Sequence, residues 1–480
     1  MRSLVWATAL ILTASTAVAQ PTPKVKDGKQ VFAITLSPMA APKPLSNYYL
    51  TPQYKEQQPG DQLSGFMKCF MEQRQFYSTE PANLREKLNE MTIDELPKDS
   101  RVQANVMAGI AYPEKFRGNG MMANMDLAAR YTRTEWNDYF RVREDGINWL
   151  LPEVQYMRML ASVLKVRLRG EVKNGEFDRA IITLRSVTGL AKMFETHPSI
   201  IGNLVGIAIQ TNAWNGVEEM IAQPGCPNLF WSLVEVPNPP HTIARGYEGE
   251  RVFLTTELDY LLTLDRPLTK PEETKCFAFF RQLVDGELPG IDGVKGGDEV
   301  RAKLTRFVAD KARVEAARGR LVSVGKMNPD AVKGFSPMQV TMTDDVLSYH
   351  ILRDELMKYR NLPYQEAMTG MEAQEKRLQA EKAQMVVAPA LLPAIKKVKA
   401  VEARNAQRVA YLRILEALRL HAAATNGELP ATLADTKLPM PLDPATGQAF
   451  EYSVKDGVAT LSGGGVGPNP RRVYEVRLRK

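Results

Sequence analysis

The strongest constraint on the fold is a helical repeat of apolar side chains in the first half of the chain. From Phe177 to Phe194, apolar residues follow one another at steps of three and one, which places them on one face of an α-helix. Gly175 precedes this stretch and His197-Pro198 follows it, and both favour a helix end. The pattern therefore predicts a helix with one buried face.

Similar patterns lie on both sides of this segment. Pro152 to Leu168 repeats the helical spacing, and Pro198 is well placed in the first turn of a third helix. The third helix would carry its apolar residues on one side, namely Ile201, Leu204, Val205, Ala208 and Ile209. Consecutive helices with short connections pack most simply as antiparallel neighbours. We therefore expect helical hairpins.

A long helix is predicted late in the chain, from about Pro393 to Ala424. Its apolar residues form a stripe roughly 120° wide, which is typical of a core-facing surface. The members are Ile395, Val398, Val401, Val409, Leu412 and Leu420. The other faces carry basic residues, which we interpret as a solvated surface: Lys396, Lys397, Lys399, Arg404, Arg408 and Arg413.

The last part of the chain changes to a strand pattern. Phe450, Tyr452 and Val454 alternate with polar residues, and Asp456-Gly457 is typical of a hairpin turn. A further alternating segment ends at Leu478. The sequence thus predicts a mainly α fold of antiparallel helical hairpins or a bundle, with a long late helix and a small C-terminal antiparallel β module. The predicted segments are 1–19 (signal peptide), 20–60 (extended or partly disordered leader), 61–225 (helical domain), 226–340 (second helical region), 341–425 (charged helices and the long helix) and 426–480 (β-rich module).

The first residues have the pattern of a secretory signal peptide. Arg2 supplies a positive charge, Leu4 to Leu12 form an apolar run, and Ala17-Val18-Ala19 is a signal-peptidase site. The apolar run is shorter than the ~20 residues needed to span a bilayer. We predict cleavage after Ala19 and a periplasmic or secreted protein; the alternative is an uncleaved anchor.

Composition limits the kinds of partner. The chain is 44% hydrophobic with a formal charge of +7, which fits a soluble globular protein after signal cleavage. No basic block interleaved with aromatic residues indicates a nucleic-acid site. An acidic polymer or a peripheral membrane contact is compatible with this charge, although a solvated surface is the favoured interpretation. We expect the partner to be another envelope protein.

The sequence contains three cysteines. Cys69 and Cys276 lie among apolar residues on predicted helices and are interpreted as buried, whereas Cys226 lies in a Pro-Gly-Cys-Pro turn. Whether two of them form a disulfide stays open. No histidine motif accompanies them, so a catalytic thiol is not expected.

We find no common catalytic, phosphate-binding or metal-binding motif, and predict no catalytic, cofactor-binding or metal-binding residue. His350 with Asp354 fits a metal pair but fits a surface ion pair better. Phe230 and Trp231 fit a ligand groove or, more simply, a helix junction. Neighbouring acids on one helix point apart, so Asp344, Asp345 and other acids would need the fold to bring them together.

Three resemblances extend these predictions. The stretch from Gly170 to Ala180, Gly-Glu-Val-Lys-Asn-Gly-Glu-Phe-Asp-Arg-Ala, resembles the turn of a tetratricopeptide-type helical hairpin, although no period of about 34 residues runs through the chain. The chain also resembles long exported proteins of planctomycete-type bacteria. This resemblance rests on the "L-x-P-x-Y" and "P-G-D" pieces between Leu50 and Asp61, on the block from Pro224 to Trp231, and on the "P-L-D-P-x-T-G" end. That last group has no assigned activity.

The C-terminal segment resembles the globular part of type II secretion pseudopilins. The match rests on Asn426-Gly427-Glu428-Leu429-Pro430 and on Asp443-Pro444-Ala445-Thr446-Gly447 followed by Phe450 and Tyr452. No Gly-Phe-x-x-x-Glu prepilin end precedes it. Some pseudopilins hold calcium near their C-terminal loops, where Asp443 and Asp456 are the only candidates, and we predict no metal there.

These observations favour a non-catalytic helical scaffold or interaction protein of the cell envelope. One alternative is a hydrolase or binding protein acting on an envelope polymer, with a site assembled from Asp344, Asp345 and Asp354. A second alternative is a secretion-pseudopilus-associated component. Convergence of three or more titratable side chains in one concave pocket would favour the hydrolase, and scattered acids would count against it.

Overall fold

The computed structural model describes residues 24–26, 28–72, 80–97, 121–136, 141, 144, 151–252, 257–285, 297–392 and 394–479. The predicted signal peptide and its cleavage site after Ala19 lie outside these residues. The mainly helical prediction with a small β module is confirmed.

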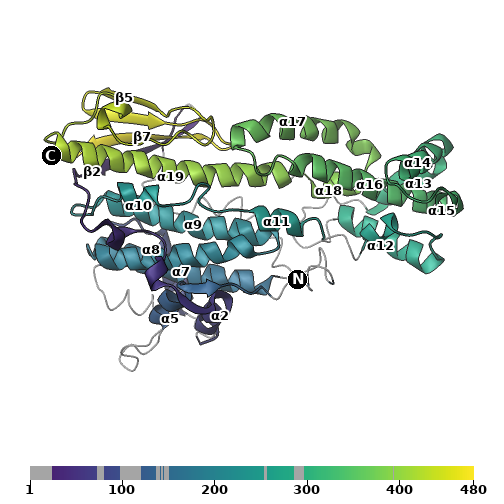
Figure 1. Cartoon of the computed structure of the whole chain (residues 1–480), viewed down its shortest axis with the longest axis horizontal. Helices are drawn as coiled ribbons and strands as arrows, with labels where there is room; N and C mark the ends of the chain where they lie inside the picture. Colours follow the sequence, from purple (N-terminus) through teal and green to yellow (C-terminus); the bar gives the residue numbers. More distant parts are fainter. Residues whose placement is uncertain are drawn as a thin grey trace.

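Three consecutive helices and one late helix form the centre of the molecule. They are α7 (Pro152–Lys173), α8 (Phe177–Met193), α9 (Ile200–Ile221) and α19 (Ala394–Ala424). Helices α7, α8 and α9 pack on one another, and α19 lies along α9 (Figure 1). The helix predicted from Phe177 is therefore present. Pro198, however, lies outside α9, because Ser199 is its N-cap and its side chain accepts from the Gly202 N–H.

The remaining helices surround this centre or extend it at the end opposite the sheet (Figure 1). They are α2 (Gln62–Glu72), α3 (Glu80–Glu90), α5 (Met121–Ala128), α10 (Phe230–Val234), α11 (Ala244–Gly249), α12 (Lys270–Asp285), α13 (Gly297–Ala309), α14 (Lys311–Ser323), α15 (Pro329–Gly334), α16 (Pro337–Met357), α17 (Tyr364–Glu381) and α18 (Val387–Leu391). Short 3₁₀ turns occur at Leu45–Tyr48, Tyr54–Glu56, Phe194–Thr196, Asp259–Leu262, Lys382–Gln384 and Leu433–Thr436.

The sheet beside α19 combines both ends of the described chain. Its strands are β1 (Lys24–Lys26), β2 (Lys29–Leu36), β5 (Glu451–Lys455), β6 (Val458–Ser462) and β7 (Arg471–Leu478), in the order β1-β2-β7-β6-β5. Strand β2 pairs in parallel with β7 and the other pairs are antiparallel, so the sheet is mixed. A separate pair joins β3 (Gln58–Asp61) to β4 (Tyr131–Arg133).

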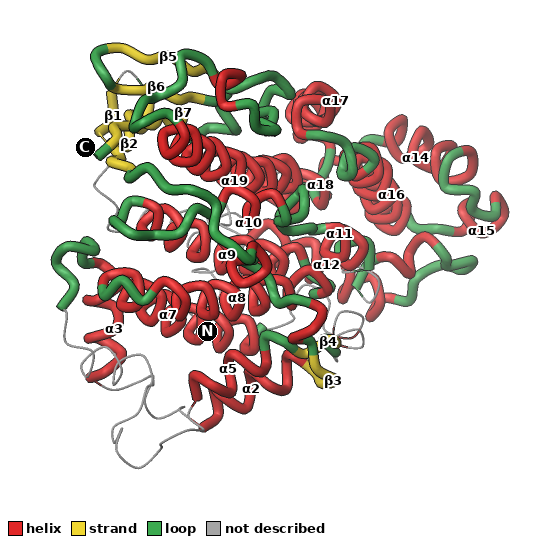
Figure 2. The backbone as a smooth tube through the Cα atoms, turned by 60° about the vertical axis from the view of Figure 1, so that its left-hand side comes forward, coloured by secondary structure: helices red, strands yellow, loops and turns green. Residues whose placement is uncertain are grey.

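The position of β2 follows from its side chains. Phe32, Ile34 and Leu36 are buried and alternate with exposed residues, as expected for a strand with one face on a core. The β module predicted from the sequence lacks this strand, because the composition of residues 20–60 indicates an extended or partly disordered leader. The largest hydrophobic core extends from Phe32 to Val476 and includes side chains of α7, α8, α9 and α19. Figure 2 shows the sheet on one side of α19, with α9 on another.

Candidate functional site

A layer of polar side chains joins α9 to α19 in the interior. The Trp214 indole N–H donates to Asn405 Oδ1 at 2.9 Å, and Asn405 Nδ2 donates to Gln210 Oε1 at 2.6 Å. Gln210 Nε2 in turn donates to the Pro240 carbonyl at 2.8 Å. Each buried polar group in this chain of contacts therefore has a partner, which is the condition for stable polar packing.

An ion cluster continues this layer towards the sheet. Glu218 on α9 contacts the Arg408 guanidinium of α19, and the Tyr474 hydroxyl of β7 donates to Glu218 Oε2 at 2.9 Å. Arg408 Nη2 also donates to Asn215 Oδ1 at 3.1 Å. Burial alone would lower the pKa of Arg408, but the Glu218 carboxylate and Tyr474 outweigh it and raise that pKa. The cluster ties together residues 256 positions apart in the sequence.

The solvated basic surface predicted for the long helix is wrong at two positions, and Lys396, Arg404 and Arg413 are partly buried. Lys399 is 6% exposed and Arg408 is 7% exposed, and both have carboxylate partners. Lys399 Nζ donates to Glu402 Oε2 at 2.7 Å. Lys397 is exposed, as predicted. Sequence distance explains the error for Arg408, since Glu218 and Tyr474 come from elements that the local helical pattern does not include.

A second buried ion pair lies near the end of α19. Arg419 and Glu416 are both fully buried, with Arg419 Nη1 2.8 Å from Glu416 Oε1. Arg419 also donates to the Cys226 carbonyl at 2.6 Å, and Asn228 Nδ2 donates to Glu416 Oε2 at 2.7 Å. Burial raises the pKa of the Cys226 thiol, which keeps it protonated. The turn containing Cys226 is therefore fixed against α19.

All three cysteines are buried and no disulfide joins any two of them, which answers the open question of a disulfide. Cys69 lies on α2 and Cys276 on α12, so both lie on helices as the sequence predicted. The Cys276 sulfur is 2.7 Å from the Tyr260 hydroxyl oxygen, and burial raises the pKa of the Cys276 thiol.

The three acids proposed for a hydrolytic site have separate partners. Asp344 lies 3.1 Å from Arg320 Nε, whereas Asp354 is 55% exposed and lies 3.7 Å from Arg251. Asp345 is buried and accepts from the N–H groups of residues 386 and 387 at 2.8 and 2.9 Å. It therefore fixes the first turn of α18, and the fold does not assemble the three carboxylates around one site.

The other candidate residues also have local contacts. His350 Nε2 is 2.7 Å from Asp259 Oδ1, so its carboxylate partner is not Asp354. Phe230 is fully buried at the start of α10 and meets Trp231 edge to face, with ring centres 5.0 Å apart. This arrangement fits the packing interpretation of the pair better than a groove.

The two acids named for calcium, Asp443 and Asp456, lie in different settings. Asp443 is 1% exposed, and its carboxylate accepts from Gln407 Nε2 at 2.8 Å, Ala445 N at 2.9 Å and Gly464 N at 2.5 Å. Asp456 is in the β5–β6 turn with φ 51°. Among the described residues, no group of three or more His, Cys, Asp or Glu side chains is placed to hold a metal ion.

One edge of the five-stranded sheet is formed by β5. Among the described strands, β5 pairs only with β6 and forms one end of the strand order. Asp456 and Gly457 both have positive φ, as a two-residue hairpin turn requires, and Lys455 pairs with Val458 to close it. Because hydrogen-bonded and non-hydrogen-bonded pairs alternate in an antiparallel ladder, the N–H and C=O groups of Tyr452 and Val454 point away from β6.

A groove lies beside this edge. It has a volume of about 1080 Å³ and is formed by the end of α19, the β5–β6 hairpin and the ends of β2 and β7. Apolar side chains in its lining include Pro38, Leu429, Val454 and Leu478. Val454 is 38% exposed, so it belongs both to the groove and to the open edge. Sequence analysis predicted this hairpin but not the groove, because the groove requires β2 and the end of α19 beside it.

The chain matches no known protein family, no characterised protein and no solved structure in our comparisons. In the part of the chain that the structure describes, no helix is both long and apolar enough to cross a membrane.

Proposed function

We propose that this chain is an exported, non-catalytic interaction protein of the cell envelope that binds an extended segment of a partner protein along β5. Export rests on the signal-peptide pattern that ends at Ala19. The open edge of β5 is the observation that carries the docking proposal. The helical body would act as the rigid support for this edge.

Backbone geometry supports an extended occupant. The outward N–H and C=O groups of Tyr452 and Val454 have no backbone partner within the described residues. A strand added beside β5 would supply one, as in other cases of β-strand addition. Such a strand gains affinity from main-chain hydrogen bonds, so its sequence need only suit the side-chain contacts.

The groove supports the same occupant by providing those contacts. Every second side chain of an added strand would lie on the same face of the sheet as Val454. That face continues into the apolar lining at Leu429 and Leu478. We therefore expect the bound segment to carry apolar residues at alternate positions and to lose affinity when these become charged.

Photo-crosslinking in intact cells tests the proposal. A photo-reactive amino acid at Ser453, an exposed position in β5, should capture one defined envelope protein. Val454→Pro removes the outward N–H and should abolish this product, while a proline is tolerated where the edge N–H faces solvent. The matched control places the same amino acid at Val324, which is 51% exposed and follows α14 at the opposite end of the molecule (Figure 1).

The two positions separate docking from chance encounter. A product that forms equally from positions 453 and 324, or that survives Val454→Pro in a folded variant, would contradict docking at β5. Peptide mapping of a specific product should place the partner's attachment site in an extended segment; attachment within a helix would contradict strand addition.

A further inference from the structure

The residues of β5 are arranged symmetrically about the middle of the strand. In order they are Glu451, Tyr452, Ser453, Val454 and Lys455. Because successive side chains of a strand point to opposite faces, the two charged residues share one face with Ser453, and the aromatic and the aliphatic residue share the other. An antiparallel copy of the same strand would therefore meet an opposite charge at each end and an apolar partner at each position between.

The outward backbone groups of β5 allow this pairing in one charge-matched register. Those of Tyr452 and Val454 point away from β6, so these two residues form the hydrogen-bonded pairs with an added strand. In a register centred on Ser453, Tyr452 of each copy lies opposite Val454 of the other, and each such pair exchanges both of its N–H···O=C bonds. A shift by two residues keeps the outward bonding but removes the contact between Glu451 and Lys455.

Both charged residues of β5 are accessible to a second copy. Lys455 is exposed, and the Glu451 side chain is 72% exposed although its Oε2 lies 3.0 Å from Arg471. The Ser462 hydroxyl and the Arg471 guanidinium hold the pKa of Glu451 below its ordinary value, so this carboxylate is charged at neutral pH. A parallel in-register pair would place each charged residue beside its own counterpart. Like charges repel, so the charges favour the antiparallel arrangement.

We propose that the segment bound along β5 is β5 of a second copy of this chain. This inference rests on the proposed docking at β5 and names its occupant. A two-fold axis at Ser453 relates the copies, so each contact occurs twice, as in an isologous dimer. The Tyr452 hydroxyl donates to the Pro430 carbonyl at 3.0 Å, which holds the ring in place. Val454 is 38% exposed and covers the Tyr452 ring of the other copy.

The proposed contact is small. A five-residue strand pair buries less surface than a standard protein interface. The dimer should therefore form at high protein concentration and dissociate on dilution.

Disulfide trapping on the full chain tests the register. In the proposed dimer, the two Ser453 residues form a non-hydrogen-bonded pair with Cα atoms about 4.5 Å apart, a distance that a disulfide can bridge. Oxidation of Ser453→Cys by glutathione disulfide should therefore give a covalent dimer on a non-reducing gel. The native cysteines are all buried, so they should not compete.

Lys455→Cys is the matched control on the same face of the same strand. In the proposed register, position 455 of one copy lies opposite position 451 of the other, so the two introduced thiols are separated by the length of β5. This variant should form a covalent dimer at least about tenfold more slowly than Ser453→Cys.

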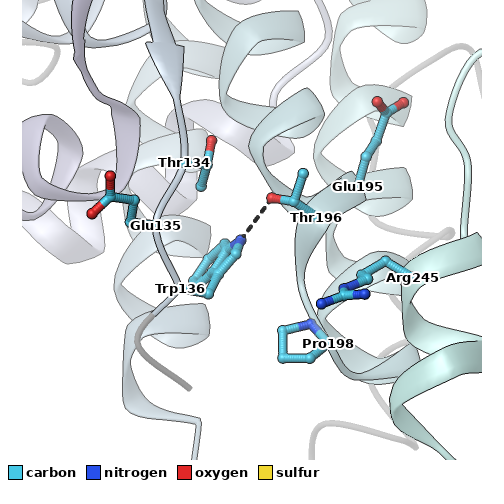
Figure 3. A pocket seen from close by; sticks show the side chains of 7 residues that line it. All are labelled: Thr134, Glu135, Trp136, Glu195, Thr196, Pro198 and Arg245. Atoms are coloured by element: carbon cyan, nitrogen blue, oxygen red, sulfur yellow. Dashed lines mark hydrogen bonds between the residues drawn. The ribbon is translucent and has the colours of Figure 1, made fainter. Parts of the chain in front are cut away.

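Glu135→Cys controls for chance encounters between exposed thiols. Glu135 belongs to the hollow at Trp136, which has a volume of about 560 Å³ and is lined by residues 134–136, 195, 196, 198 and 245. Its side chain is 61% exposed, and Figure 3 shows it across the hollow from Arg245. Figure 2 shows β4, which ends two residues before it, on the other side of the helical centre from β5. This variant should also dimerise slowly.

Charge exchange tests the same contacts without a covalent bond. Lys455→Glu and Glu451→Lys each turn both end contacts of their own dimer into like-charge pairs. Self-association measured by light scattering should therefore weaken by about tenfold for either variant alone. A mixture of the two variants has opposite charges at both ends again and should recover association.

The outcomes separate the occupant from the docking edge. Absence of a covalent dimer from Ser453→Cys would overturn self-pairing, as would equal rates for the three cysteine variants. Under self-pairing, the photo-crosslinked product from position 453 has the mass of two copies. If that product instead contains a different envelope protein, docking at β5 stands and its proposed occupant is wrong. If neither experiment gives a product, both proposals fail.

Discussion

Polar groups are buried and paired in the α9–α19 interface, whereas at the β5 edge they face outward. In the interface, Glu218, Arg408 and Tyr474 are each under a tenth exposed and contact one another. At the edge, the backbone groups of Tyr452 and Val454 face outward without a backbone partner in the described chain. The interior charges thus hold distant segments together, whereas the outward backbone groups of β5 are open to a partner. The predictions below test that division.

The largest effect is expected from breaking the interface cluster. Arg408→Met leaves Glu218 buried beside Tyr474, with Arg472 3.7 Å away as its remaining cation. Removing one member of a buried ion pair typically costs about 3–5 kcal/mol of stability. Urea denaturation followed by circular dichroism should show a clearly lower midpoint. The midpoint is the proper measure, since a long chain with several cores need not unfold in one step.

The matched control is an exposed arginine. Arg179→Met removes a surface pair in which the arginine is 72% exposed and should cost about 0–1 kcal/mol. Equal midpoints for the two variants would show that the α9–α19 cluster does not hold the segments together.

A smaller, pH-dependent effect is expected at Asp345. Burial raises the pKa of the Asp345 carboxyl group to about 6, and the nearby Asp344 also raises it. The N–H groups of residues 386 and 387 and the charge of Lys303 lower this pKa, but burial outweighs them. A folded-state pKa above the unfolded value of 3.8 gives stability that is present below about pH 4 and lost as the pH rises through about 6. Asp345→Asn removes this titration, so the variant should gain stability relative to wild type between pH 4 and 7.

The shift of about two pH units corresponds to at most about 3 kcal/mol. Urea midpoints of both proteins, measured from pH 4 to 7, provide the comparison. Parallel curves would mean that the carboxyl group of Asp345 titrates at its ordinary pH in the folded chain.

A pair of proline variants tests the direction of the β5 amides. Ser453 pairs with Thr460, so its N–H points into the ladder, whereas that of Val454 points outward. Ser453→Pro should therefore cost about 1–3 kcal/mol, because it removes a ladder hydrogen bond, and Val454→Pro should cost less. Thermal unfolding of the two full-length variants compares them directly. The reverse order would show that the outer edge of β5 is already bonded.

Sequence alone predicted the elements that have a local cause. The helical spacing from Phe177 gave α8, and the stripe from Ile395 gave α19. Asp456-Gly457 gave the hairpin, because two positive-φ positions require such residues. Each of these patterns is made by residues that follow one another closely in the sequence.

Long-range contacts could not be predicted in the same way. Strand β2 carries the alternation of Phe32, Ile34 and Leu36, but nothing near it indicates that its neighbour is β7. Arg408 has the local setting of a surface residue, and its partners lie on α9 and β7. The hollow at Trp136 likewise needs three separate segments, so no single motif indicates it.

Hydrogen exchange of the β5 amides tests the central claim most directly. In the free full-length protein, the amides of Tyr452 and Val454 should exchange much faster than those of Ser453 and Lys455, which bond to β6. This alternation at single-residue resolution would establish β5 as an open edge supported by a paired interior. Uniform protection along β5 would contradict it, because the outward groups would then already have partners.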